Sequence, residues 1–343
     1  MSQAYTFAIM GCGMIAGIHV AAINAIPGAI LTGVHDVVEE RCIAFAKKHN
    51  CRAYPTQQAL LEDSRVDIVC ICTPSGLHAS AAVAAANAGK HVIVEKPMAI
   101  NLADADAVIE AGRLNGVQIC VISQLRFSPA VDALRHALHS GALGKMVLGN
   151  LHMKYHRSAE YYKSGVWRGT WEMDGGGALM NQGIHGVDLL CYICGPVTTV
   201  TARAKTLVHS IEVEDTVCAI LEFENGALGI LEATTAMKPG YNRQLEVCGS
   251  EGSVVLEENT VSKWDLTLDY PMPENNNIVT GSANDPANIS YTGHLCQFEN
   301  LLKAIRGEDS LMVDAKQGRI PLALILAIYE SAKTGCTVKL IGD

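Results

Sequence analysis

The stretch from Thr6 to Gly17 constrains the fold of this chain more than any other part of the sequence. It reads as a short apolar strand that runs into a glycine-rich turn and then a helix. Gly11 permits a tight turn, and Gly13 lets the backbone approach a pyrophosphate. Ala16, the third small residue, lets the helix pack closely against the strand. The phosphates would lie at the N-terminus of that helix, where backbone N–H groups point outward. The pattern predicts a dinucleotide-binding turn.

The second apolar segment strengthens this interpretation, because glycine-rich turns also occur in ordinary loops and in methyltransferases. Ala29 to His35 is followed by Asp36, and an acidic residue at the end of the second strand can bind both hydroxyls of an adenosine ribose. A carboxylate would repel a 2′-phosphate, and Val37 and Val38 offer no cation, so we expect NAD, with NADP less favoured. Arg41 lies one helical turn further on. The expected contacts from this region are Gly11, Gly13, Met14, Ile15 and Asp36.

Composition excludes several classes of protein. Of the 343 residues, 49% are hydrophobic and 18% are charged, as in folded globular proteins. The net charge of −9, without clustered Lys and Arg, argues against a nucleic-acid-binding surface. No positively charged leader and no membrane-length apolar run are visible, so we expect a cytoplasmic protein. The 12 cysteines are scattered through apolar segments, and Cys191 and Cys194 form a single pair with no second pair to complete a zinc site. We expect buried thiols and no metal.

The order of elements predicts two domains. In residues 1–123 short apolar strands alternate with amphipathic helices, which indicates an α/β Rossmann domain with a doubly wound parallel sheet. In residues 124–343 several strands follow one another, and Asn225-Gly226 is a strong hairpin signal. This half is predicted to be an α+β domain with a large, mostly antiparallel open sheet, which binds substrate and forms oligomers.

Lys96 is the first candidate for chemistry. It follows a predicted parallel strand and stands between Glu95 and Pro97, on the side of the sheet where ligands bind. A lysine there can hydrogen-bond a substrate hydroxyl and stabilise a developing alkoxide. By position alone, a surface lysine paired with Glu95 is an equally good interpretation.

Asn181, His185 and Asp188 form the second constellation. They stand at i, i+4 and i+7 of a helix that follows three glycines, so one helix face carries all three. A histidine can accept a hydroxyl proton near neutral pH, and a general base typically contributes about 10²–10⁴-fold to the rate. A structural histidine at a domain junction is the alternative, and it is the better interpretation when the helix is considered alone.

Together these residues resemble the glucose-fructose oxidoreductase, inositol dehydrogenase and rhizopine-catabolism (Gfo/Idh/MocA) family of NAD(P)-dependent sugar oxidoreductases. The resemblance covers essentially the whole chain. It rests on the Gly11 turn, the Thr73-Pro74 loop that ends in His78, the Glu95-Lys96-Pro97 motif, and Gly175–Gly177 followed by His185 and Asp188. It implies that Lys96 and His185 are the catalytic pair and that Asn181 assists them. It also implies cofactor contacts from Thr73, Pro74, His78, Glu95 and Lys96.

Two positions depart from the family pattern. The family often has aspartate where this chain has Asn181, and asparagine where it has Ser75. Asn181 can orient a hydroxyl but cannot share a proton, so more of the base's work would fall on His185.

The segment before the three glycines looks most like members that act on sugar nucleotides such as UDP-N-acetylglucosaminuronate, although members acting on free sugars or inositols look similar. Its cations and aromatic side chains could bind a carboxylate or phosphate and stack on a ring, or its arginines could form a solvated rim. The expected substrate contacts are Lys96, Arg157, Tyr162, Trp167, Arg168, Asn181 and His185, with Lys154, Tyr161 and Lys163 as further candidates.

The resemblance therefore implies oxidation of a secondary hydroxyl of a sugar, sugar nucleotide or cyclitol. Two alternatives stay open. One is an NAD-dependent glycoside hydrolase that uses a transient redox cycle, and the other is a non-catalytic sugar or cofactor sensor, which would not need to keep Lys96 and His185. The open sheet has edges and a face to cover, so we expect a homodimer or homotetramer, with no nucleic-acid or membrane partner.

Overall fold

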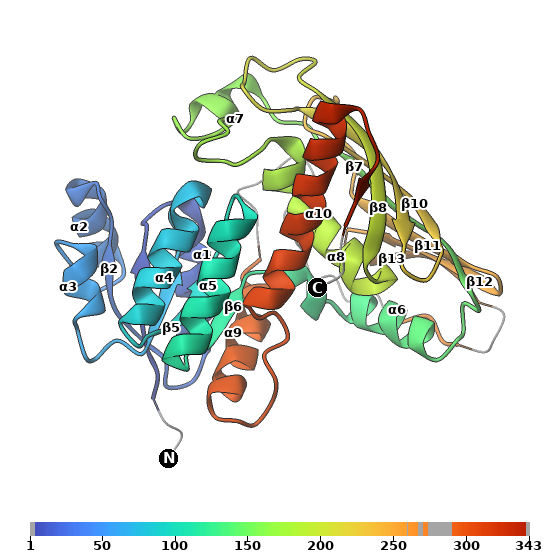
Figure 1. The fold of residues 1–343 in the computed structure, drawn as a ribbon. Coiled ribbons are helices and arrows are strands. Elements are labelled where there is room, and N and C mark those ends of the chain that lie inside the picture. Colours follow the sequence, from blue (N-terminus) through green and yellow to red (C-terminus); the bar gives the residue numbers. More distant parts are fainter. Residues whose placement is uncertain (1–3, 259, 267–269, 274–289, 341–343) are drawn as a thin grey trace. The chain divides into compact units, whose positions relative to one another are not determined.

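A computed structural model describes residues 4–258, 260–266, 270–273 and 290–340. The chain divides into two compact units, each described here by itself. Unit 1 comprises Met1–Gln124 and Tyr291–Arg319, and unit 2 comprises Leu125–Ser290 and Ile320–Asp343. Figure 1 gives the element labels. No helix among the described residues has the length and apolarity needed to span a membrane.

Unit 1 is built on a parallel sheet of order β3-β2-β1-β4-β5-β6, as predicted for a Rossmann domain. The crossover at β1 separates the two halves of the doubly wound sheet, and ligands bind such sheets at the carboxyl ends of the strands. The strands are β1 (Thr6–Met10), β2 (Ile30–His35), β3 (Arg52–Ala53), β4 (Ile68–Ile71), β5 (His91–Val94) and β6 (Ile119–Val121). The helices are α1 (Met14–Ala25), α2 (Glu39–Lys48), α3 (Gln57–Leu61), α4 (His78–Asn87), α5 (Leu102–Asn115) and α9 (Thr292–Ile305). Two short helical turns are η1 (Ser75–Leu77) and η2 (Gln124–Phe127). The first residue of η2 belongs to unit 1 and the rest belong to unit 2.

The helix ends in unit 1 follow local sequence signals. Thr56 caps α3 by accepting a hydrogen bond from the N–H of Ala59, and Asn101 caps α5 in the same way. Gly116 ends α5 in the left-handed conformation at φ 64°. Residues of the types that favour helix starts and helix ends therefore stand at these three positions.

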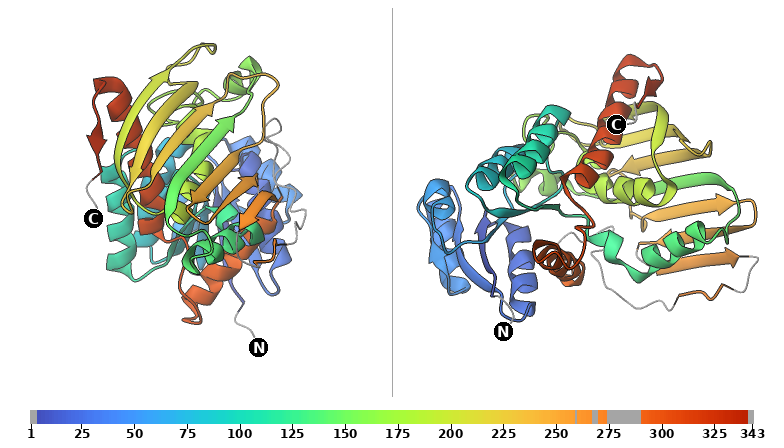
Figure 2. Two further views of the ribbon diagram at one scale, coloured as in Figure 1. Left: turned by 90° about the vertical axis from the view of Figure 1, so that its right-hand side faces the viewer. Right: turned by 60° about the horizontal axis from the view of Figure 1, so that its bottom comes forward.

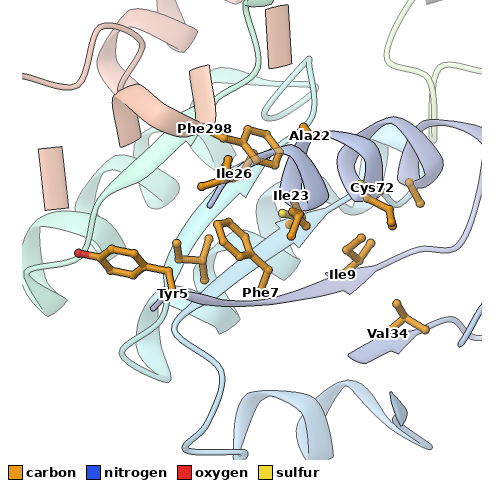
Figure 3. Packing of buried hydrophobic residues seen from close by; sticks show 14 of the residues in the cluster. Tyr5, Phe7, Ile9, Ala22, Ile23, Ile26, Val34, Cys72 and Phe298 are labelled. Carbon is orange, nitrogen blue, oxygen red and sulfur yellow. The ribbon is translucent and has the colours of Figure 1, made fainter. Parts of the chain in front are cut away.

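Helix α9 joins unit 1 although it lies far along the chain. Its buried residues include Phe298, whose ring stacks on Phe7 of β1 at a centroid distance of 6.1 Å. Figure 3 shows both rings in the cluster that also holds Ile9 and Ile23. Because burial of this apolar surface stabilises the sheet, a C-terminal segment completes the N-terminal unit. The sequence-based division at residue 123 assumed two uninterrupted domains and did not anticipate this.

Unit 2 contains one eight-stranded sheet of order β13-β12-β11-β7-β10-β9-β8-β14. Its pairs are antiparallel except for β7 with β10, which is parallel. The strands are β7 (Met146–Lys154), β8 (Val197–Lys205), β9 (Thr216–Phe223), β10 (Leu228–Thr234), β11 (Gln244–Gly249), β12 (Gly252–Glu257), β13 (Thr260–Leu266) and β14 (Val338–Lys339). The large, mostly antiparallel open sheet predicted from sequence is confirmed, including the hairpin at Gly226, whose φ is 82°.

The helices of unit 2 cover one face of this sheet. Helix α8 packs on β7 and β11, and α6 packs on β12, as Figure 2 shows from two sides. The helices are α6 (Pro129–His139), α7 (Ala159–Lys163), α8 (Ile184–Cys194) and α10 (Ala315–Thr334), and a π-helical turn, η3 (Ala178–Gly183), leads into α8. The first residues of α10 belong to unit 1 and the rest to unit 2. The twelve cysteines are all free, and Cys191 and Cys194 are buried in α8.

Candidate functional site

The glycine-rich turn of unit 1 has the geometry that a phosphate-binding turn requires. Gly11 has φ +91°, and a Cβ there would lie 2.5 Å from the carbonyl oxygen of Cys72, so only glycine fits. Gly13 precedes α1 without a side-chain cap, and a Cβ at Gly13 would meet no atom within 4 Å. The glycines therefore keep the space in front of the helix N-terminus clear, and N–H groups that can bind an anion face that space.

Asp36 lies at the end of β2, where its carboxylate is 8% exposed. Its two oxygens accept hydrogen bonds from the N–H groups of Cys12 and Val38, each at 2.8 Å. The carboxylate thus fastens the glycine-rich turn to the second strand. Two carboxylate oxygens offer about four acceptor sites, so capacity remains for ribose hydroxyls. The guanidinium of Arg41 lies 3.5 Å from the carboxylate of Asp36. In the same turn, burial raises the pKa of the Cys12 thiol to about 12.

The loop after β4 offers a polar group of the kind that a cofactor would use. The hydroxyl oxygen of Thr73 is buried and has no hydrogen-bond partner within the described part of the chain. His78, in contrast, has both ring nitrogens occupied, at 2.7 Å from the carbonyl oxygens of Thr73 and Pro97. Burial lowers the pKa of His78. His78 therefore braces two loops against each other rather than presenting a free nitrogen to a ligand.

Glu95 is also turned inward, with 5% of its surface exposed. Its carboxylate accepts a hydrogen bond from Nε2 of His19 at 2.9 Å and lies 3.6 Å from Nε2 of His294. Burial alone would raise the pKa of Glu95, but the hydrogen bond from His19 and the nearby ring of His294 hold it well below its usual value. The three ligand atoms lie within 4.8 Å of one another, a spacing that could hold a metal ion.

Glu95 also contacts the backbone of the predicted catalytic lysine. Its second carboxylate oxygen accepts from the N–H of Lys96 at 3.3 Å. Lys96 itself is half-buried immediately beyond β5. These residues of unit 1 fit a dinucleotide on three observations, namely the clear space at Gly13, the carboxylate of Asp36 and the unsatisfied hydroxyl of Thr73.

In unit 2, Asn181 belongs to η3, while His185 and Asp188 belong to α8. Asn181 and His185 are half-buried, whereas Asp188 is 2% exposed. Asp188 accepts two hydrogen bonds from the guanidinium of Arg126, at 2.6 and 2.9 Å, and that guanidinium also lies 4.3 Å from the ring centroid of Tyr192. The third member of the predicted constellation thus anchors α8 through a buried ion pair.

A cluster of polar aromatic and cationic side chains lies in the same unit. Tyr161 Oη accepts hydrogen bonds from Arg168 at 2.6 Å and from Gln182 at 2.8 Å. The guanidinium of Arg168 lies 4.4 Å from the Tyr161 ring centroid and 4.6 Å from that of Trp167. Arg157 is 7% exposed, with its guanidinium 5.5 Å from the Tyr161 ring. Tyr161, Arg168, Trp167 and Arg157, predicted from sequence as substrate contacts, therefore meet in one place.

Tyr162 borders this cluster, since its ring centroid lies 5.2 Å from that of Tyr161, and it shares a hydrogen bond with the hydroxyl of Thr235 at 2.8 Å. The two predicted lysines lie differently. Lys154 forms an ion pair with Glu232 at 2.6 Å, so its charge is already matched by a carboxylate. Lys163 is exposed. In the sequence, Lys154 and Lys163 were grouped with the cluster only because they stand near its residues along the chain.

Two buried carboxylates near Asn181 were missed in the sequence. Asp174 is 2% exposed and accepts from Nδ2 of Asn181 at 2.7 Å. Glu214 accepts from the N–H groups of Gly177 and Leu179, each at 2.8 Å, and from the hydroxyl of Tyr329 at 3.0 Å. It therefore caps the N-terminus of η3, and burial raises its pKa to about 7. Asp174 directly before three glycines was the one visible signal; nothing near Glu214 in sequence indicated its partner.

Comparison with known proteins agrees with both units. Residues 5–123 match the family model described as an oxidoreductase family with an NAD-binding Rossmann fold, and residues 131–255 match the model of the GFO/IDH/MocA C-terminal domain. The WlbA dehydrogenase from Bordetella pertussis, solved with NADH and UDP-GlcNAcA, is 31% identical, with 99% of this chain and 100% of that chain covered and a TM-score of 0.90.

Two further relatives extend the comparison. The WlbA dehydrogenase from Chromobacterium violaceum, solved with the same two compounds, is 32% identical over 100% of this chain and 98% of that chain, with a TM-score of 0.91. Myo-inositol 2-dehydrogenase of Thermotoga maritima is 28% identical, over 97% of each chain. The two family models and the full-length relatives agree, and this chain belongs to the GFO/IDH/MocA family of NAD-dependent oxidoreductases.

Proposed function

We propose that the protein oxidises a secondary hydroxyl of a sugar, sugar nucleotide or cyclitol, with Lys96 and His185 as its catalytic pair. The observation that carries most weight is the likeness over the whole chain to two dehydrogenases solved with NADH and UDP-GlcNAcA. The relative from Thermotoga maritima, named for myo-inositol, keeps the cyclitol class open. An anionic sugar derivative such as a sugar nucleotide is the favoured substrate.

The residues of unit 1 would hold the cofactor. The backbone around Gly13 would bind the pyrophosphate, the carboxylate of Asp36 would accept from the adenosine ribose, and the buried hydroxyl of Thr73 would gain a partner. His78 and Glu95 would act indirectly, by bracing the loops that carry these contacts. When bound, NAD supplies the acceptor for a hydride.

The catalytic side chains would divide the work on the substrate hydroxyl. His185 would take its proton, which the near-neutral pKa of an imidazole suits. The ammonium of Lys96 would stabilise the negative charge that develops on the oxygen. Asn181 would orient the substrate through a neighbouring hydroxyl without exchanging a proton.

The cluster of Tyr161, Trp167, Arg168 and Arg157 supports an anionic substrate. Two guanidinium groups lie beside aromatic rings, an arrangement that can pair with a carboxylate or phosphate while a ring stacks on the sugar or base.

The test is NADH absorbance when protein and NAD are mixed with UDP-GlcNAcA, free aldoses and inositols in parallel. We expect turnover with an anionic sugar derivative and a loss of about 100-fold or more in kcat for Lys96→Ala and His185→Ala. Lys48→Ala and His139→Ala, which remove exposed side chains of the same types, serve as controls. Undiminished turnover by either catalytic variant would contradict the assigned pair.

We also propose that the outer face of the unit 2 sheet forms a homodimer or homotetramer. Ile220 and Ile230 are paired across β9 and β10 and are 63% and 51% exposed. On the same face Leu228 pairs with Leu148 of β7, and these two side chains are 53% and 37% exposed. A contiguous apolar patch on an open sheet favours association with a second copy.

A further inference from the structure

Asp174 serves two different hydrogen-bond donors, one with each oxygen of its carboxylate. Oδ1 accepts from Nδ2 of Asn181 at 2.7 Å, and Oδ2 accepts from the backbone N–H of Gly169 at 2.9 Å. The side chain is 2% exposed. A buried charge is stable only when it is hydrogen-bonded, so both donors matter to this carboxylate.

This pairing fixes which way round the amide of Asn181 stands. An asparagine amide has a donating end, Nδ2, and an accepting end, Oδ1, whereas an ionised carboxylate only accepts. The opposite orientation would place Oδ1 against Oδ1 of Asp174, acceptor against acceptor. The nitrogen of Gln182 approaches Oδ1 of Asn181 at 3.4 Å, which is consistent with an accepting oxygen on that side.

The local backbone explains how residues seven apart meet. Gly175 and Gly176 have φ values of 76° and 159°, so the chain turns sharply directly after Asp174. The π-helical turn η3 then carries Asn181 back toward the carboxylate. Side chains other than glycine rarely adopt a φ of 76°, so the glycines are what allows this juxtaposition.

We propose that Asp174 is a positioning residue that holds Asn181 with its carbonyl oxygen presented as a hydrogen-bond acceptor to a substrate hydroxyl next to the one that His185 deprotonates. The proposal rests on the proposed function, because it assigns Asn181 to the substrate. It adds that Asn181 accepts a hydrogen bond and that the carboxylate imposing this role is seven residues away. The rival interpretation is that Asp174 only holds the Gly169 loop.

The first experiment follows the Asn181 side-chain amide by ¹H–¹⁵N NMR of the NAD-loaded protein without substrate, with the signal assigned by its loss in Asn181→Asp. We expect one Nδ2 proton to be shifted downfield and protected from exchange, and both properties to disappear in Asp174→Asn. An Asn181 signal unchanged by Asp174→Asn would overturn the proposal. This result does not depend on turnover, so it stands even if UDP-GlcNAcA proves not to be a substrate and the proposed function fails.

The second experiment uses kinetics with UDP-GlcNAcA and NAD. An asparagine at 174 has one accepting oxygen and cannot serve both Gly169 and Asn181, so we expect Asp174→Asn to lower kcat about 10–100-fold. The exchange variant Asp174→Asn/Asn181→Asp restores both bonds, with residue 174 donating to an accepting oxygen at 181. It should regain at least about tenfold of the loss.

The rival interpretation predicts a different pattern. If Asp174 only holds the loop, Asp174→Asn can keep its bond to Gly169, and the exchange variant gains nothing. Equal kcat values for Asp174→Asn and the exchange variant would therefore refute the positioning role. Thermal unfolding of each variant shows whether any loss reflects misfolding instead.

Discussion

Glu214 should make the stability of unit 2 depend on pH in a defined window. Its carboxylate is buried and its pKa is raised from 4.5 to about 7, chiefly by burial, although three donors favour the charged form. Between these two pH values the folded chain keeps this proton and the unfolded chain has lost it. The unfolded state thus binds fewer protons, and the free energy of unfolding falls as the pH rises.

The size of the effect follows from the two pKa values. At about 1.36 kcal/mol per pH unit, the interval from 4.5 to about 7 corresponds to about 3.4 kcal/mol. The contribution is present in full below pH 4.5, is lost progressively up to pH 7, and is constant above. Because Glu214 caps the N-terminus of η3, this free energy bears directly on the segment that carries Asn181.

The assay is urea unfolding of wild type and Glu214→Gln between pH 5 and 8, followed by tryptophan fluorescence. The three tryptophans, Trp167, Trp171 and Trp264, all belong to unit 2, so the signal reports this unit. Glutamine has one accepting oxygen, so the variant is expected to lose stability at every pH. The difference between the two proteins should nevertheless shrink by about 2 kcal/mol as the pH rises from 5 to 7.

The control is Glu224→Gln, which removes one exposed carboxylate from the same unit. Parallel curves for wild type and Glu214→Gln across the window, or a curve for Glu224→Gln that is as flat as that of Glu214→Gln, would refute the reasoning.

Three further changes test other parts of the account. Gly11→Ala should lower the free energy of unfolding by about 2–4 kcal/mol and weaken NAD binding at least about tenfold, because a Cβ there would lie 2.5 Å from a backbone oxygen. Calorimetry and NAD titration measure the two effects. The control is Gly17→Ala, because a Cβ at Gly17 meets nothing within 4 Å. Arg126→Met should lower the free energy of unfolding in urea by about 3–5 kcal/mol, because it leaves the carboxylate of Asp188 buried and unpaired. Adding Asp188→Leu should recover part of the lost stability. A double variant less stable than Arg126→Met would contradict this prediction. Ile220→Asp should reduce the molar mass measured by light scattering to that of the monomer, and a wild type that is itself monomeric would exclude the proposed interface.

Local sequence signals predicted the parts of the fold that depend on neighbouring residues. The turn at Gly226 was foreseen because its conformation favours glycine for a reason contained in a few residues. The Rossmann sheet was predictable for the same reason, since its alternation of strand and helix repeats along the chain.

Long-range pairing was not predictable in this way. The parallel contact of β7 with β10 joins strands about 80 residues apart, and Phe298 reaches β1 from the other end of the chain. Hydrophobic patterning marks such residues as buried but does not name their partners.

The candidate site shows the same division. The residues proposed to meet ligands could be predicted because glycine, lysine and histidine have chemical meaning at these places in the sequence. Their supports were not, because Asp174 and Glu214 act through bonds that only the turned backbone creates. Asp188 was assigned with the catalytic face, and Arg126, which binds it, is 62 residues away.

The central claim is that hydride passes from a carbon of the substrate to NAD. The most direct measurement mixes the protein, NAD and UDP-GlcNAcA deuterated on its ring carbons, and determines the mass of the cofactor recovered. The account predicts reduced cofactor carrying one deuterium, formed by wild type and not by Lys96→Ala or His185→Ala. Recovery of NAD that is neither reduced nor labelled, from a protein that binds both compounds, would contradict it.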